Sequence, residues 1–309
     1  MIEGQEGVTW EQWVALARAC EESGIEALYR SDHYLGFHAS GTHGSLDCWT
    51  TLAGLAAVTS TLRLGSLVSP VTFRHPSVLS RAAATVDHIS GGRVELGIGG
   101  GWMEPEHRGY GFPFPETRVR MEMLAEQLEI VHRQWTEDSF EFDGRHYQLE
   151  GSAALPKPVQ QPHPPLIVGG AARAGTLGPA VRWADEYNTT FPTDDELIAR
   201  HARLLAECER QGREPLRFSL MTMCIVGADE AEFTERARAV YELGQRDADF
   251  DEWLVARRSS AILGTVDEVV TRLQQLAEMG VDGVMLQHLR HDDLESVALI
   301  GREIAPAVA

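Results

Sequence analysis

Short apolar runs alternate with longer amphipathic runs along most of the chain, and this alternation predicts strands followed by helices. The expected strands are the runs IEALYRSDHY, LRLGSLVSPV, RVELGIGG, PPLIVGGAA, DEYNTT, LRFSLMTMCIVGA and MGVDGVMLQHL. Helical spacing marks a segment that begins after a Thr9 N-cap, the runs DCWTTLAGLAAVT, HPSVLSRAAATVDHIS and AGTLGPAVRWA, and residues 118–135, 194–211 and 266–276. Because most of these strands are apolar on both faces, we expect a parallel sheet covered by helices.

The number of strands predicts an α/β fold of the TIM-type (β/α)8 barrel class, with residues 1–309 as a single domain. Seven full strands are found, and MIEG at the start fits the tip of an eighth. We therefore expect a barrel with insertion segments whose first strand is truncated at the N-terminus. Loss of most of that strand would leave two neighbouring strand edges unpaired. One insertion, FEFDGRHYQL, reads as a hairpin with Asp143-Gly144 at its turn.

The glycine-rich stretch VELGIGGGW raises the question of a dinucleotide-binding loop. Such a loop needs G-x-G-x-x-G at the start of a helix. Gly97 and Gly99 supply two glycines, but Trp102 stands where the third belongs. The next residues, MEPEHRGYGFPFP, are rich in Pro and Gly, so no helix is predicted there. The stretch is better interpreted as a barrel strand with a glycine end, which lets a flat ligand approach the backbone.

Composition excludes several classes of protein. A net charge of −19 disfavours nucleic acid as a partner, because phosphate binding needs clustered Lys and Arg. No apolar run approaches the ~18 residues that span a membrane, and the N-terminus lacks the features of a secretory signal, so a cytoplasmic location is expected. The four scattered cysteines form no C-x-x-C pair, which predicts free thiols.

Candidate chemistry gathers in SDHYLGFHASGTH. His33, His38 and His43 are too widely spaced for a typical zinc signature, so no metal is expected. His33 directly follows a strand, where a proton donor or acceptor would stand, and Asp32 could orient it; a purely structural histidine is the alternative. The chain contains no G-x-S-x-G, which disfavours a hydrolase. Trp102 is either a rim aromatic or a wall of a substrate pocket.

Six segments together resemble the luciferase-like monooxygenase superfamily, and within it the coenzyme F420-dependent oxidoreductases. They are YRSDHY, GSLVSPVTFRHP, ISGGRVELGIGGGW, PKPVQQPHPPLIVGG, WADEYN and GTVDEVVTRLQQLAEMGVDGVML. The resemblance covers nearly the whole chain, in order. It implies a TIM-type barrel, often a homodimer, with a flavin or deazaflavin bound at the carboxyl ends of the strands.

The resemblance also implies particular site residues. A cis peptide bond behind the cofactor ring maps to Ser66–Leu67, in a bulge that includes Val68, and the family's Asp-His pair maps to Asp32 and His33. Backbone contacts to the cofactor map to Gly100-Gly101 and to Val168-Gly169-Gly170. For the anionic tail of F420, Arg74 and Arg173 are candidates, helped by the N–H groups of the Gly169-Gly170 turn; solvated surface charges are the alternative.

The function that follows is hydride transfer between C5 of F420 and a small organic substrate, with His33 handling a proton. Sugar-phosphate dehydrogenases of this family carry basic residues after the sixth strand, whereas EYNTTFPTDD has none, and their acidic residue after the fourth-strand glycines is Trp102 here. An apolar or aromatic substrate is therefore expected. The alternatives are an FMN-dependent monooxygenase with a partner reductase, and a cofactor-binding barrel without catalysis.

Overall fold

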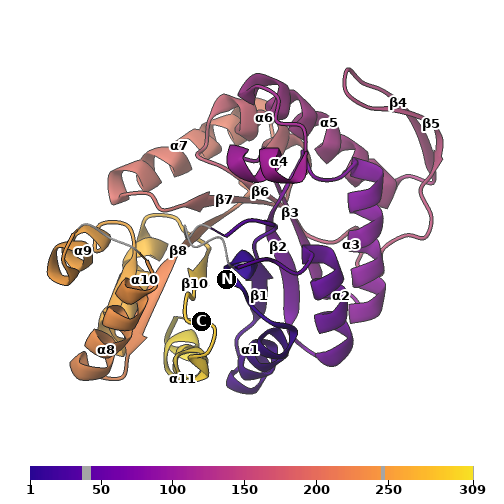
Figure 1. Cartoon of the computed structure of the whole chain (residues 1–309). Helices are drawn as coiled ribbons and strands as arrows, with labels where there is room; N and C mark the ends of the chain where they lie inside the picture. The colour runs from indigo at the N-terminus through magenta and orange to yellow at the C-terminus, as the bar shows by residue number, and fades with distance from the viewer. Residues whose placement is uncertain (37–42, 245–247, 309) are drawn as a thin grey trace.

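Parallel strands form the centre of the molecule and helices surround them (Figure 1). The computed structural model describes residues 1–36, 43–244 and 248–308. Within these ranges seven parallel strands follow one another in the sheet: β1 (Ala27–Arg30), β2 (Arg63–Pro70), β3 (Val94–Gly99), β6 (Leu166–Gly169), β7 (Glu186–Thr190), β8 (Arg217–Gly227) and β10 (Gly283–Gln287). This is the α/β TIM-type barrel order that the alternation predicted, with β1 and β10 at the two ends of the sheet.

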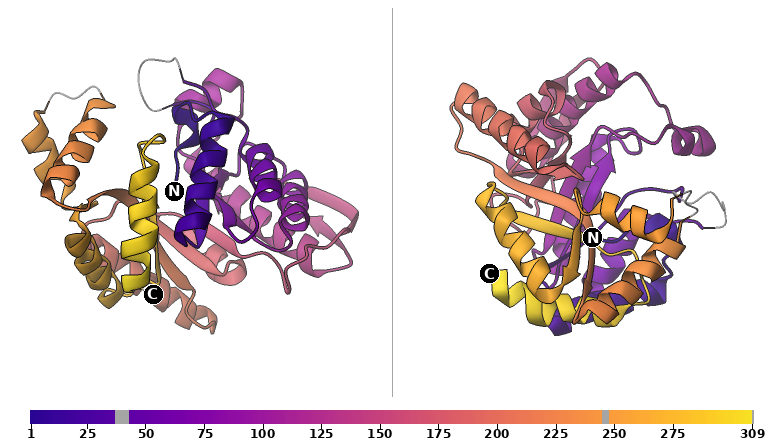
Figure 2. Two further views of the ribbon diagram at one scale, coloured as in Figure 1. Left: turned by 90° about the horizontal axis from the view of Figure 1, so that it is seen from below. Right: turned by 90° about the vertical axis from the view of Figure 1, so that its left-hand side faces the viewer.

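Helices lie between successive strands and pack on the outside of the sheet (Figure 2). They are α1 (Trp10–Ser23), α2 (Cys48–Val58), α3 (Pro76–Ser90), α4 (Glu104–Tyr110), α5 (Thr117–Thr136), α6 (Ala174–Trp183), α7 (Asp194–Gln211), α8 (Glu230–Glu242), α9 (Phe250–Arg257), α10 (Val266–Glu278), α11 (Leu294–Leu299) and α12 (Ala305–Val308), with a 3-10 turn η1 (Gly4–Glu6) and a π-helical turn η2 (Ile300–Ile304).

Local sequence signals set the bounds of the well-predicted helices. The Thr9 hydroxyl accepts the N–H of Gln12, and the Gln12 side chain accepts the N–H of Thr9, so α1 begins with a complete capping box. α7 begins in the same way at Thr193, and Gly212 ends it in the left-handed conformation. The predicted helix over 194–211 is confirmed residue for residue.

Two apolar layers hold the barrel together. The outer layer lies between the sheet and the helices and includes Trp13, Leu64 and Leu96. The inner layer fills the barrel itself, where Tyr29, Ile167 and other inward side chains meet. Burying a large apolar side chain stabilises the fold by about 1.5–3 kcal/mol, so these layers are the main source of stability. Cys20, Cys48, Cys208 and Cys224 are free thiols, as predicted, and all four are buried.

The segment from Met103 to Pro115 departs from the prediction. Its Pro and Gly residues predicted no helix, yet α4 begins at Glu104. Pro105 stands in the first turn, where its missing N–H costs nothing, and Gly111 ends the helix at φ 73°. The segment is therefore a short helix that has Pro105 in its first turn and that Gly111 ends.

The predicted hairpin forms from β4 (Ser139–Asp143) and β5 (Gln148–Ala153), and it stands at the edge of the barrel in Figure 1. By contrast, no strand was predicted at β9 (Ile262–Thr265), which pairs with the far end of the long β8. Among the described residues, no helix is long and apolar enough to cross a bilayer.

Candidate functional site

β2 interrupts its pairing with β3 where the family resemblance implied a bulge. Ser66 lies opposite Leu96, but Ser69 lies opposite Ile98, so that Leu67 and Val68 together face Gly97 alone. The cis peptide bond joins Leu67 to Val68. The expected position, Ser66–Leu67, is therefore wrong by one residue.

The side chain of Ser66 explains this shift. Its hydroxyl donates to the carbonyl of Gly97 over 3.0 Å and accepts the N–H of the same residue over 3.2 Å. These two bonds keep Ser66 in register with β3, so the bulge begins only after it.

Three glycines surround the side chain of Val68. A Cβ placed on Gly99 would lie 2.6 Å from Val68 Cγ2, and one on Gly169 would lie 3.0 Å from Val68 Cγ1. A Cβ on Gly97 would collide first with the Ser66 carbonyl oxygen, at 2.3 Å, and would also lie 2.8 Å from Val68 Cγ1. The glycine end of β3, interpreted from sequence as room for a ligand, first of all makes room for Val68.

The other mapped cofactor segments present mostly backbone. Val168 is fully buried, so its side chain belongs to the core. The N–H of Gly170 donates to the carbonyl of Asn188 over 3.0 Å, which contradicts its expected role as an anion donor. Gly101 has φ 73°, and Gly100 lies against the end of the Met121 side chain.

His33 is paired with a residue that the sequence did not single out. Its Nδ1 lies 2.9 Å from Oε2 of Glu106 in α4; the Glu106 side chain is fully buried and the His33 side chain is 12% exposed. Glu106 Oε1 also accepts the N–H groups of Tyr34 and Leu35, the latter over 2.9 Å. Glu106 thus fixes both the imidazole and the loop that carries it.

Electrostatics favours the charged pair. Burial alone would lower the pKa of His33, but the hydrogen bond and charge of Glu106 outweigh it and raise that pKa. Burial opposes ionisation of Glu106 as well, yet the bond to His33 lowers its pKa. Both directions favour an imidazolium bound to a carboxylate.

Asp32 does not orient His33, as had been expected. Its Oδ2 accepts the Ser69 hydroxyl over 2.6 Å and an Arg74 N–H over 2.5 Å. Arg74 also donates to Asp47 over 2.7 Å, and its side chain is only 12% exposed. The guanidinium of Arg74 therefore already has two carboxylate partners, which leaves it a poor candidate for the anionic tail of a cofactor.

Trp102 lies just after the end of β3, next to His33. The residue is 63% exposed, and its ring lies edge-on to His33 with 5.8 Å between the ring centroids. The structure therefore brings together four residues of the predicted or observed site: Asp32, His33, Glu106 and Trp102. The hydrogen bond from Ser69 to Asp32 connects the Val68 bulge to this group.

Arg173 lies apart from this group, beside a hollow of about 580 Å³ at the start of α6. Arg200, Arg203 and Glu196 of α7 line the same hollow, and Glu196 Oε2 lies 3.4 Å from an Arg200 nitrogen. Arg200 donates to the Thr189 hydroxyl over 2.7 Å, at the end of β7, and Arg203 donates to the carbonyl of Ala172 over 3.1 Å. The residues that directly follow β7 include no basic one, but Arg200 of α7 folds back to the end of β7.

The possible metal ligands do not gather. Among the described residues, no group of three or more His, Cys, Asp or Glu side chains is placed to hold an ion. His38 lies outside these residues.

Comparison with known proteins identifies the family. The family model described as luciferase-like monooxygenase matches residues 2–283. The chain belongs to the luciferase-like monooxygenase family. This luciferase-like chain is 30% identical over 295 residues to pyrimidine monooxygenase RutA of Stutzerimonas stutzeri, covering 85% of the chain and 78% of that relative.

Other members differ in the cofactor that their names state. An FMNH(2)-dependent dimethylsulfone monooxygenase of Pseudomonas putida is 25% identical over 320 residues, covering 95% of this chain and 86% of that relative. The coenzyme F420-dependent tetrahydromethanopterin reductase of Methanopyrus kandleri superposes with a TM-score of 0.81 at 18% identity, covering 100% of this chain and 98% of that one. The luciferase-like chain is thus an oxidoreductase by family, and its fold is shared by users of both cofactors.

Proposed function

We propose that this protein is an F420-dependent oxidoreductase that transfers a hydride between the deazaflavin and a small organic substrate. The observation that carries the proposal is the paired His33 and Glu106 beside the Val68 bulge, at the carboxyl ends of β1, β2 and β3. In a TIM-type barrel this end is where chemistry takes place. The choice of F420 is supported by the six sequence segments, which resemble the F420-dependent branch most closely.

The residues present fit a planar ring with an anionic chain. Val68 offers a half-buried apolar side chain on the bulge, against which the flat face of a ring could pack. The hollow lined by Arg173, Arg200 and Arg203 could hold phosphate or carboxylate groups of the chain. When bound, F420 supplies a two-electron donor or acceptor at C5 and reacts poorly with O₂.

His33 would move the proton that accompanies the hydride. Glu106 holds Nδ1, so we assign Nε2 to proton transfer with the substrate. Because Glu106 stabilises the imidazolium, His33 would act as the acid when a substrate is reduced. When a substrate is oxidised, His33 would accept the proton, and Glu106 would stabilise the imidazolium that forms. Glu106 is a positioning residue in this scheme.

Trp102 would form one wall of the substrate site, since it is exposed and its ring contacts His33. It supports an apolar or aromatic substrate. The absence of basic residues directly after β7 is a weaker argument against a sugar phosphate than expected, because Arg200 reaches the end of β7 from α7. Phosphorylated compounds therefore belong in a substrate screen beside enones and imines.

An FMN-dependent monooxygenase with a partner reductase is the second candidate. It is favoured by the two relatives, a pyrimidine monooxygenase and an FMNH(2)-dependent sulfone monooxygenase. A barrel that binds cofactor without catalysis is the third. A homodimer and a cytoplasmic location remain predictions, the first of which light scattering would test.

Paired fluorescence titrations with F420 and FMN test the proposal. We expect tighter binding of oxidised F420, and turnover of an activated alkene with reduced F420 that falls roughly 10²–10⁴-fold in His33→Ala. Cofactor affinity should change less in that variant. Tighter FMN binding, or a bound yellow flavin on the isolated protein, would transfer the assignment to the monooxygenase. Binding without any turnover would favour the third candidate.

A further inference from the structure

Helix α4 carries the carboxylate that holds His33, and it is too short to be stable on its own. It has seven residues, no side chain in the described part of the chain caps its start, and Gly109 lies within it. An isolated helix of fewer than about 12 residues is marginal in water, and an internal glycine weakens it further. Contacts with other elements must therefore hold α4, and with it Glu106, in place.

Two consecutive residues of α4 supply such contacts. Glu106 bonds the loop after β1, which carries His33. His107 bonds the loop after β2, because its Nε2 lies 2.6 Å from Oγ1 of Thr72. Consecutive residues of an α-helix point about 100° apart, so the two side chains reach different loops. The helix thus ties the loop that carries the imidazole to the loop that follows the Val68 bulge.

The second ring nitrogen of His107 is also bonded. Its Nδ1 lies 2.8 Å from the carbonyl oxygen of Met103, which can only accept a hydrogen bond. Nδ1 therefore carries a hydrogen, and in the neutral imidazole Nε2 accepts the hydrogen of the Thr72 hydroxyl. His107 and Thr72 are both buried, so loss of either side chain would leave the polar group of the other without its partner.

The pair of Thr72 and His107 lies against a segment that we expect to contact the cofactor. Gly101 follows β3 with φ 73°. A Cβ placed on Gly101 would lie 3.4 Å from Thr72 Oγ1 and 3.8 Å from His107 Cε1. The pair is therefore next to the backbone on the cofactor side and, through α4, connected to the carboxylate on His33.

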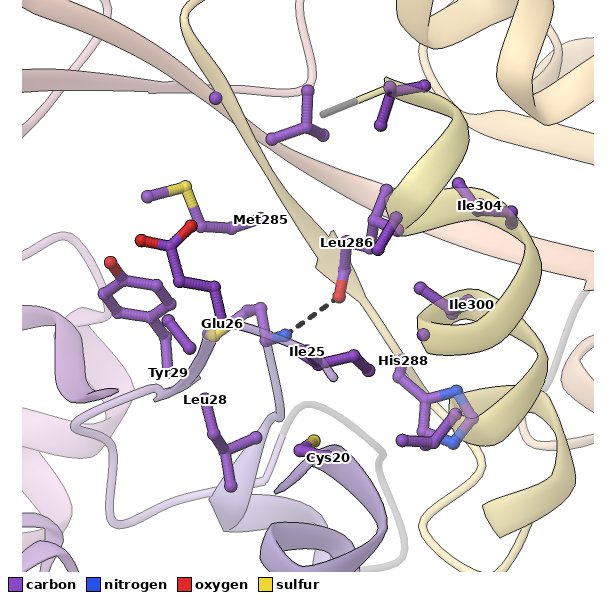
Figure 3. A pocket seen from close by; sticks show the side chains of 18 of the residues that line it. Cys20, Ile25, Glu26, Leu28, Tyr29, Met285, Leu286, His288, Ile300 and Ile304 are labelled. Atoms are coloured by element: carbon purple, nitrogen blue, oxygen red, sulfur yellow. Dashed lines mark hydrogen bonds between the residues drawn. The ribbon is translucent and has the colours of Figure 1, made fainter. Parts of the chain in front are cut away.

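A second buried histidine near the carboxyl ends of the strands has different surroundings. His288 directly follows β10 and lines a cavity of about 680 Å³ between β1 and β10 (Figure 3). Within the described residues its Nε2 has no hydrogen-bond partner, and burial lowers the pKa of its ring to about 4. Only His107, of these two, is bonded to a loop of the proposed site.

We propose that His107 is a positioning residue for proton transfer: its bond to Thr72 holds α4 on the loop after β2 and so keeps the Glu106 carboxylate on Nδ1 of His33. The inference rests on the proposed function, in which His33 moves the proton. His107 exchanges no proton with the substrate in this scheme, since both of its ring nitrogens are bonded within the protein.

Packing alone is the competing explanation for a histidine at this position. The ring centroids of Phe73 and Phe114 lie 5.0 Å and 4.5 Å from that of His107. His107→Phe keeps an aromatic ring there and removes both hydrogen bonds. His107→Gln loses the ring but keeps an amide oxygen that can accept the Thr72 hydroxyl. Thr72→Val removes that hydroxyl with little change of shape.

NMR titration of the His33 ring in the cofactor-free protein tests the proposal. We expect the pKa of His33 to fall in His107→Phe and in Thr72→Val, because the carboxylate that stabilises the imidazolium is no longer held on Nδ1. His107→Gln should stay near the wild type. Arg108→Gln is the control in the same helix, because it breaks only an exposed ion pair with Glu104, and it should leave the titration unchanged.

Turnover with reduced F420 is the second measurement. It should fall roughly 5- to 50-fold in His107→Phe, since small displacements of a positioned group have effects of this order. The loss should appear in kcat, with little change in F420 affinity, and His107→Gln should recover most of it. A double variant of Thr72→Val and His107→Phe should lose no more than the more affected single variant, because both remove the same bond.

An unchanged His33 titration in folded His107→Phe and Thr72→Val would overturn the proposal. Thr72→Val decides alone where His107→Phe fails to fold, since it leaves His107 and its ring contacts in place. Equal turnover of His107→Phe and an active wild type would overturn it as well. A wild type without turnover would instead refute the proposed function, because the titration needs neither cofactor nor substrate.

Discussion

His33 shows how a single side chain can gain its chemistry from a residue far away in sequence. Glu106 lies 73 positions later, on a helix that the sequence did not predict, and its carboxylate contacts the imidazole at 2.9 Å. The neighbouring Asp32, which adjacency favoured as the partner, is bound to Ser69 and Arg74. Adjacency in sequence is a poor guide here because consecutive residues after a strand point in different directions.

Replacing Glu106 by Gln should lower the pKa of His33, because the amide keeps an acceptor oxygen but loses the charge that stabilises the imidazolium. The raised pKa of His33 means that its stabilising contribution is complete below the unfolded pKa and disappears as pH rises through the folded value. The lowered pKa of Glu106 sets the acid limit, since its contribution disappears as pH falls through the folded value.

Two measurements check this prediction. NMR titration of the His33 ring should show the lower pKa in Glu106→Gln. The difference in free energy of unfolding between the wild type and the variant should be largest between the unfolded pKa of Glu and the unfolded pKa of His, where both contributions are complete. Turnover should fall in Glu106→Gln, by less than in His33→Ala. An unchanged His33 titration would leave Glu106 only the role of anchoring the loop at Tyr34 and Leu35.

At the scale of elements, the bulge in β2 depends on the absence of side chains from its neighbours. Gly97 and Gly99 lie on β3 and Gly169 ends β6, and each would place a Cβ within about 3 Å of Val68. The glycines of two strands and the bulge of a third thus form one unit. A change in any of them is transmitted to the surface that we propose holds the cofactor.

We therefore expect Gly99→Ala, whose new Cβ would meet Val68 Cγ2 at 2.6 Å, to destabilise the protein by about 1–3 kcal/mol, the usual effect of overpacking, and to weaken cofactor binding. Gly109 in α4 is the matched control, because a Cβ there meets nothing within 4 Å. Gly109→Ala should stabilise the protein by roughly 0.5–1 kcal/mol and leave binding unchanged. Chemical denaturation and cofactor titration check both variants. Equal stability of Gly99→Ala and wild type would show that Val68 is not tightly packed against β3.

The strands and long helices could be predicted because each carries its own periodicity, as residues 194–211 show. α4 could not, since Pro105, Gly109 and Gly111 each resemble a breaker until their places in the helix are known. The cis bond was placed one residue early because the bonds from Ser66 to Gly97 arise only when β2 and β3 pair. Arg200 was missed because it reaches the end of β7 from the following helix.

At the scale of the whole molecule, charge opposes the proposed ligand. The net charge is −19, and the chain of F420 is anionic, so long-range repulsion should slow their encounter. The affinity must come from nearby groups, and Arg173, Arg200 and Arg203 beside one hollow are the candidates. Long-range repulsion acts mainly on association, whereas the local pairs act mainly on dissociation.

Salt should therefore change the two rate constants in different ways. Raising NaCl from about 10 mM to about 150 mM shortens the Debye length from about 30 Å to about 8 Å, which screens the repulsion. We expect the association rate constant for F420 to rise by roughly two- to ten-fold, and the dissociation rate constant to rise as well, because the arginine contacts are partly screened. Stopped-flow fluorescence measures both, with uncharged riboflavin as the control ligand whose association should not respond. An association rate that falls with salt would mean that the arginine hollow, rather than the net charge, governs the encounter.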